Sequence, residues 1–160
     1  MPNIFHNTIT ISGPEEVVQM FMSTLKGGEN SPFLTALIPP PEDASDEWFE
    51  TNWCNTREGH VLGDWEKVGE NTFSLNVDTA WGAPYEVLVK VSELYPLLQI
   101  KMVCCSGESL ACGYAIIKNG IDTESVYWSY GRENTDEAKE YARGVFGKAF
   151  VDEGKFYEEG

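Results

Sequence analysis

Residues able to do chemistry are concentrated between Asn52 and Trp65, in the stretch NWCNTREGHVLGDW. Cys54 and His60 supply a thiol and an imidazole, which are donor types that bind zinc. A cysteine near a histidine is also the pair used in nucleophilic catalysis. The stretch is therefore a candidate metal site, a candidate catalytic loop, or an element whose aromatic residues serve packing.

The other cysteines do not complete a zinc motif. Cys104, Cys105 and Cys112 lie much later in the chain, and no C-x-x-C or H-x-x-x-H spacing occurs. Because adjacent residues of a strand point to opposite faces, Cys104 and Cys105 do not easily hold one ion. Buried cysteines acting as small hydrophobic residues are the favoured interpretation. We expect no metal and no other cofactor.

A cysteine nucleophile would need a histidine base and a third group that orients this base. Only His6 and His60 are available, and no third group is suggested by the spacing. The segment SGESLACG lacks the G-x-S-x-G pattern and the phosphate-loop pattern. We therefore expect a protein that is not an enzyme. The alternative is a small-ligand-binding protein or an enzyme, with a pocket around Trp53, His60, Asp78 and Trp81.

The chain carries a large negative charge. Its 160 residues include 26 acids against 11 lysines and arginines, a formal net charge of −15. This charge repels nucleic-acid phosphates and anionic membrane surfaces at long range, so direct binding to either is disfavoured. A protein or protein complex with a basic surface is the complementary partner. Simple solubility explains the acidity equally well.

Part of the acidity lies in a long excursion over residues 29–51, where three consecutive prolines exclude a regular helix or central strand. Ser45 is placed to cap a short helix after these prolines. DNA presents one negative charge per roughly 1.7 Å of axis, so a rigid acidic surface can imitate it. The predicted partner-binding residues are Glu42, Asp43, Asp46, Glu47, Glu50, Arg57 and Glu58.

Hydrophobic periodicity predicts the elements around these residues. We expect strands over 3–12, 64–68, 72–79, 98–105, 111–118 and 125–130, and helices from Pro14 to Lys26, from Pro84 to Tyr95 and from Asp136 to Phe150. The order contains the split β-α-β unit of ferredoxin-like folds. The predicted class is α+β: an antiparallel ferredoxin-like sheet with helices on one face, plus extra strands and a C-terminal helix. Residues 1–160 are expected to form one domain, with a core over 1–120 and an addition over 121–160.

Three short motifs carry a family resemblance. Met1-Pro2-Asn3, Asn52-Trp53 and Thr79-Ala80-Trp81 resemble motifs of the YubB-like ferredoxin-like domains of phages and conjugative plasmids. Cys54 replaces the motif glycine after Asn52-Trp53, and the following segment is longer than usual. The resemblance covers about 120 residues, the size of one domain, and implies the fold and a mobile-element setting. It implies no catalytic residues, and we expect Asn52, Trp53 and Trp81 to be structural.

These observations lead to one functional expectation. The chain is expected to be an acidic, non-enzymatic protein-binding accessory factor from a mobile genetic element. It would inhibit a host nucleic-acid-binding defence complex, as an anti-CRISPR does, by covering a basic surface, with DNA mimicry as one form of this action. No apolar run approaches the roughly 20 residues needed to span a bilayer, and no basic region precedes an apolar run near Met1. We therefore expect action in the host cytoplasm.

Overall fold

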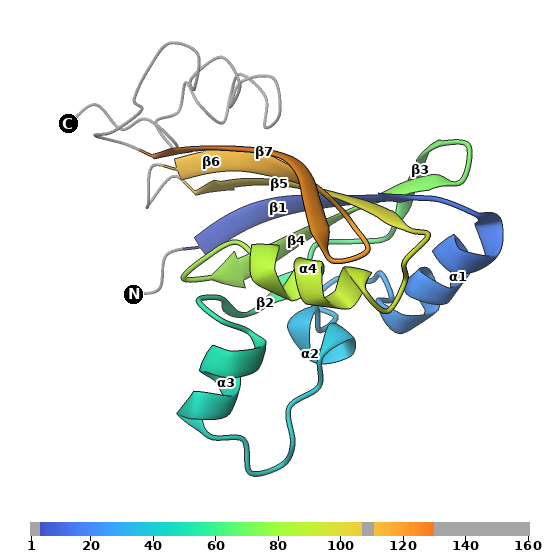
Figure 1. Ribbon diagram of the computed structural model, residues 1–160. Helices are drawn as coiled ribbons and strands as arrows, with labels where there is room; N and C mark the ends of the chain where they lie inside the picture. The colour runs from blue at the N-terminus through green and yellow to red at the C-terminus, as the bar shows by residue number, and fades with distance from the viewer. Residues whose placement is uncertain (1–3, 107–110, 130–160) are drawn as a thin grey trace.

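The computed structural model describes residues 4–106 and 111–129 of the chain. In this part, seven strands form one antiparallel sheet, with the order β2-β4-β1-β5-β6-β7 and with β3 also paired to β4 (Figure 1). The elements in chain order are β1 (Ile4–Ser12), α1 (Glu15–Thr24), α2 (Leu34–Leu37), α3 (Asp46–Asn52), β2 (Arg57–Val61), β3 (Glu66–Gly69), β4 (Thr72–Ala80), α4 (Tyr85–Ser92), β5 (Gln99–Ser106), β6 (Ala111–Lys118) and β7 (Ile121–Ser129).

Strand β1 lies in the middle of the sheet, between β4 and β5, and is antiparallel to both. Its side chains alternate between two faces, as the period of a strand requires. Phe5, Ile9 and Ile11 are buried on one face. His6 and Thr8 lie on the other face and are only partly buried. The apolar face of β1 is the centre of the hydrophobic core.

All four helices of the described residues lie on the same side of the sheet (Figure 1). Helix α1 buries Val18 and Phe21, and α4 buries Val87, Leu88 and Val91. These positions follow the helical period of three or four residues, which creates one apolar stripe per helix. The Pro14 and Pro84 residues directly precede the two helices, where a missing backbone N–H costs nothing.

The path from β1 through α1 to the β3–β4 edge, and from there through α4 to β5, is a split β-α-β arrangement. The predicted α+β ferredoxin-like class is therefore confirmed. Strands β6 and β7 are the extra strands, and β7 is longer than the predicted 125–130 segment because it begins at Ile121. The predicted helix from Asp136 to Phe150 lies outside the described residues.

The sequence predicts no strand between Asn52-Trp53 and residue 64, and here the structure differs from the prediction. Residues Arg57–Val61 form strand β2, which pairs with β4 at the edge of the sheet. The pairing has an irregularity between Arg57 and His60. Gly59 is needed there, because an added Cβ would lie 1.8 Å from the carbonyl oxygen of Asp78. The β2 backbone therefore approaches β4 more closely than a side chain allows.

Candidate functional site

The acidic segment predicted to bind a partner is exposed in the structure. Its five carboxylate side chains, Glu42, Asp43, Asp46, Glu47 and Glu50, are all exposed. The single ion pair of the described residues joins two other groups, so none of the five acids has a counter-ion there. Figure 1 shows α3 and the loop before it extending from the side of the sheet that carries the helices. We call these five residues and α3 the acidic surface.

Helix α3 begins where the sequence predicts it. The Ser45 hydroxyl accepts a hydrogen bond from the backbone N–H of Trp48 at 3.2 Å. Asp46 and Glu47 lie in the first turn, where their charge interacts favourably with the positive end of the helix dipole. Glu50 lies one turn further along the same side of the helix. Like charges at this spacing are slightly destabilising, so the arrangement is not explained by helix stability alone.

Three aromatic residues support the acidic surface from below. Trp48, Phe49 and Trp53 contact one another edge to face, with ring centroids 4.9–5.9 Å apart. Trp53 is only 4% exposed, and its indole N–H donates to the carbonyl of Ile38 at 3.0 Å. Asn52 donates from its side chain to the Trp48 carbonyl. The Asn52-Trp53 motif thus holds the end of α3 against the preceding proline-rich loop.

Arg57 and Glu58, the other two predicted partner-binding residues, are engaged within the protein. The Arg57 guanidinium donates to the carbonyls of Cys54 and Thr56 and lies 5.6 Å from the centre of the Phe49 ring. The Glu58 carboxylate accepts hydrogen bonds from three consecutive backbone N–H groups at the start of α2. These side chains position α2 and α3, whereas the five exposed acids remain available for contact.

The alternative pocket around Trp53, His60, Asp78 and Trp81 is not formed. Trp53 packs in the core on the helix-covered side of the sheet, whereas His60 is paired with Asp78 across β2 and β4. The Asp78 carboxylate lies 2.8 Å from Nδ1 of His6 on the face of the sheet opposite the helices. Trp81 lines the cavity described below, and the other three residues are not part of that lining. The four residues therefore do not share one site.

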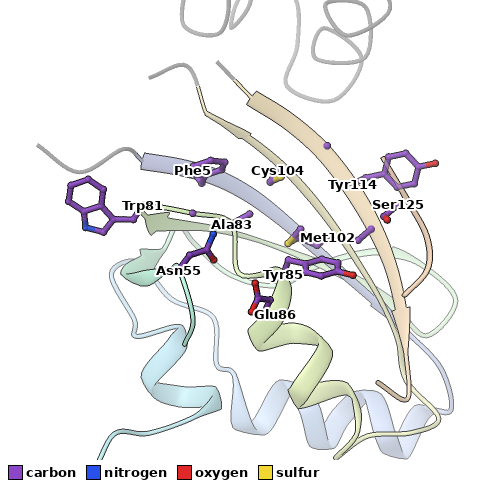
Figure 2. Close-up of a pocket in the computed structure, with 13 residues that line it drawn as sticks. Phe5, Asn55, Trp81, Ala83, Tyr85, Glu86, Met102, Cys104, Tyr114 and Ser125 are labelled. Carbon is purple, nitrogen blue, oxygen red and sulfur yellow. The ribbon is translucent and has the colours of Figure 1, made fainter. Parts of the chain in front are cut away.

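A cavity of about 440 Å³ does exist, between the sheet and the start of α4. Its floor is formed by Phe5, Met102, Cys104, Gly113 and Ala115, from β1, β5 and β6. Figure 2 shows Tyr85, Glu86 and Asn55 on the other side of this space, and the Trp81 ring at its edge, directed away from the other labelled side chains. The volume lies within the range of small-ligand pockets, roughly 300–1,000 Å³.

The rim of the cavity is held by two buried threonines. The hydroxyls of Thr56 and Thr79 both donate to the carbonyl of Gly82 at 2.8 Å. They fix the turn after β4, in which Trp81 adopts a φ of 73° and its side chain is 54% exposed. A left-handed backbone at a residue other than glycine is uncommon, and such positions cluster at functional sites. Asn55 lies against Gly82 and closes the turn from the α3 side.

A second hollow, open to solvent, joins the cavity rim to the acidic surface. It is lined by Glu50, Cys54, Asn55, Arg57 and Trp81. Asn55 and Trp81 also line the cavity described above. The acidic surface, the hollow and the cavity therefore form one continuous region on the side of the protein near α3 and the start of α4.

Two cysteine thiols of this region have raised pKa values. Burial raises the pKa of the Cys104 thiol to about 12. Burial and the nearby Glu86 carboxylate raise the pKa of Cys54 as well. Thiolates are the reactive form, so raised pKa values lower reactivity at neutral pH. The neighbours that influence Cys54 are Glu86 and Lys90, not the predicted base His60. In the described residues, no group of three or more His, Cys, Asp or Glu could hold a metal ion.

The cavity was not predicted from the sequence, although one signal for it exists. Three successive inward positions of β6 carry small residues, namely Ala111, Gly113 and Ala115. The following inward position is occupied by the larger Ile117. Small side chains at inward positions of a strand leave space that larger residues would fill. The opposing strand places Met102 and Cys104 directly across from Ala115 and Gly113. The run of small residues is thus the local cause of the cavity.

The fold and this region define an α+β protein of ferredoxin-like architecture. A family model described as the ferredoxin-like domain in Api92-like protein matches residues 48–147, more than half of the chain. The chain therefore belongs to the family of ferredoxin-like domains of Api92-like proteins. Searches of curated proteins and of solved structures found no significant match. Among the described residues, no helix is long and apolar enough to cross a membrane.

Proposed function

We propose that this protein is a non-enzymatic accessory factor that binds a partner protein through its acidic surface. The observation that carries the proposal is the exposure of Glu42, Asp43, Asp46, Glu47 and Glu50 without a counter-ion in the described part of the chain. Charges of one sign on one surface speed association with a surface of the opposite sign. The complementary partner is a protein or complex with a basic surface.

The support beneath the acidic surface favours a specific interaction over simple solubility. Solubility requires only scattered charge. Here Ser45 caps α3, Trp53 is buried beneath it, and Arg57 is hydrogen-bonded to the backbone at its end. A surface that is ordered before binding loses less conformational entropy on association. The α3 backbone that carries Asp46, Glu47 and Glu50 is therefore held in place before binding.

The family resemblance favours a mobile-element setting for this interaction. The motifs Met1-Pro2-Asn3, Asn52-Trp53 and Thr79-Ala80-Trp81 resemble YubB-like domains of phages and conjugative plasmids. In such a setting, the basic partner would be a host defence complex that binds nucleic acid in the cytoplasm. An acidic surface that occupies the nucleic-acid channel would inhibit this complex, as an anti-CRISPR or DNA mimic does.

Affinity capture from host lysate, followed by mass spectrometry, identifies the partner. The affinity of the purified partner is then measured for a variant with Glu42→Gln, Asp43→Asn and Glu50→Gln, which leaves the first turn of α3 unchanged. We expect affinity to fall at least about tenfold, mainly through slower association, and the difference to shrink as salt is added.

The matched control carries Glu29→Gln, Glu66→Gln and Glu70→Gln. These three acids are also exposed, and their neutralisation changes the net charge by the same amount. Two of them lie at the β3–β4 hairpin, away from α3 (Figure 1). Equal loss of affinity in both variants would show that only net charge matters. Unchanged affinity in the first variant would exclude the acidic surface as the contact.

A further inference from the structure

The cavity beneath Tyr85 has a definite electrostatic character. Of its thirteen lining residues, Glu86 is the one that carries a carboxylate side chain, and none is lysine, arginine or histidine. The hydrogen bond from Tyr85 to Asp122, 2.6 Å long, raises the pKa of the tyrosine to about 12 and keeps it neutral. The Cys104 thiol is protonated for the reason given above. The lining therefore carries one negative charge.

The positive end of the α4 helix dipole does not reverse the negative charge of the cavity lining. Helix α4 begins at Tyr85, and a helix N-terminus contributes about half a positive charge. Pro84 has no backbone N–H to offer an anion. Glu86 lies in the first turn and contributes a full negative charge. The sum at the mouth of the cavity stays negative.

Cationic side chains lie around the cavity but do not line it. The Lys101 ammonium lies 5.8 Å from the centre of the ring of Tyr114, a lining residue. The Lys90 ammonium donates to the backbone carbonyl of Thr51 at the end of α3. The Arg57 guanidinium donates to the carbonyls of Cys54 and Thr56. None of these three side chains lines the cavity. The negative charge of Glu86 is thus not matched by a cation inside the cavity.

Apolar and aromatic groups make up most of the remaining lining. Phe5 and Tyr85 contribute rings, Met102 contributes a thioether, and Trp81 stands at the edge (Figure 2). Aromatic faces attract cations through their quadrupole, and this attraction is strongest where water is partly excluded. A neutral apolar ligand would gain nothing from Glu86, and an anion would be repelled by it.

We propose that this cavity binds an organic cation, namely an ammonium or guanidinium group on a short apolar stem. The cationic group lies near Glu86 and the aromatic rings, and the stem contacts Met102 and Ala115. The inference does not rest on the function proposed above, because none of the five residues of the acidic surface lines the cavity. A side chain of a bound protein and a free amine share this chemistry.

The test is an NMR titration of the full chain with three probes. Choline represents a free quaternary amine, N-acetyl-arginine amide represents a protein side chain, and 3,3-dimethylbutanol is the uncharged counterpart of choline. We expect saturable shifts of the Met102 and Ala115 methyl signals with at least one cation and not with the alcohol. Tighter binding of the arginine derivative assigns the cavity to a partner side chain, whereas tighter binding of choline assigns it to a free amine.

Two variants make the test specific. Glu86→Gln is expected to weaken cation binding roughly fivefold, the size of an exposed charge interaction. The control Glu16→Gln removes an exposed acid from the first turn of α1, so it changes net charge and the helix terminus in the same way. Ala83→Leu fills the cavity and should abolish binding, while circular dichroism checks that each variant is folded. Equal binding of the alcohol, equal effects of the two glutamine variants, or no saturable shift with either cation would overturn the inference.

Discussion

Glu58 is a residue whose charge serves the fold. Its carboxylate accepts from the backbone N–H groups of Phe33, Leu34 and Thr35 at 3.2, 2.8 and 2.9 Å. These groups begin α2, which has no side-chain cap of its own. A carboxylate from β2, a distant part of the sequence, thereby joins α2 to the edge of the sheet.

Glu58→Ala is expected to lower the free energy of unfolding by about 1–3 kcal/mol, because partly buried N–H groups lose their acceptor. Glu58→Gln retains one acceptor oxygen, so its free energy of unfolding should fall by a smaller amount. Urea unfolding of the two variants measures the difference. Glu66→Ala, at an exposed position of β3, is the control and should change stability by less than about 0.5 kcal/mol. Similar values for the Glu58 and Glu66 alanine variants would contradict this role.

The edge formed by β2 shows how a single element depends on close backbone approach. An added Cβ at Gly59 would overlap the Asp78 carbonyl, whereas at Gly69 it would meet the Thr72 side chain at an ordinary distance of 3.4 Å. The two glycines lie in neighbouring edge strands that both pair with β4. They therefore form a matched pair for substitution.

Gly59→Ala is expected to separate β2 from β4 and to cost more than about 2 kcal/mol of stability. Amide hydrogen exchange should become faster at Leu62, whose backbone N–H donates to the Asn76 carbonyl of β4 at 2.9 Å. Gly69→Ala should leave both measurements close to those of the unsubstituted protein. Retained protection of β2 in the Gly59 variant would mean that the strand can shift without loss.

Elements with a local pattern could be predicted from the sequence. Strand β1, helices α1 and α4, and the strands β3 to β6 follow from periodicity and turn residues, and Ser45 predicted the start of α3. Strand β2 and helix α2 were missed because their stability is non-local. Strand β2 contains Gly59 and depends on pairing with β4. Helix α2 has only four residues and is capped by Glu58 from β2.

The candidate site was predictable to a similar degree. The exposed acids follow from composition and from the prolines that precede them. The engagement of Arg57 and Glu58 within the fold could not be read from the sequence, because it depends on contacts with α2 and the end of α3. The cavity depends on which face of β6 turns inward, a property set by the register of the whole sheet.

The whole molecule should lose stability at alkaline pH. Burial raises the pKa of the Cys104 thiol from 9.0 to about 12. The pKa of the Cys105 thiol is also raised, chiefly by burial. Below about pH 9, these thiols are protonated in both folded and unfolded chains. Above about pH 9, the cysteine thiols of the unfolded chain release protons that the folded chain retains. The unfolded state is therefore favoured as the pH rises.

We expect the free energy of unfolding to fall between about pH 9 and pH 12, by up to about 1.4 kcal/mol per pH unit for each such thiol. Urea unfolding at a series of pH values measures this slope. Cys104→Ala removes one of the groups and should give a shallower slope, even if its stability at neutral pH is lower. An unchanged slope would show that Cys104 ionises as easily in the folded protein as in the unfolded one.

The division of the sheet edge into β2 and β3 has a consequence for recognition. The two short strands share β4 as their neighbour, and each shows a shift in register, between Arg57 and His60 and between Lys67 and Gly69. Addition of a foreign strand needs an uninterrupted row of free backbone groups. This edge offers none of sufficient length. A partner on this side must therefore identify the protein by side chains, and a second copy cannot extend the sheet here.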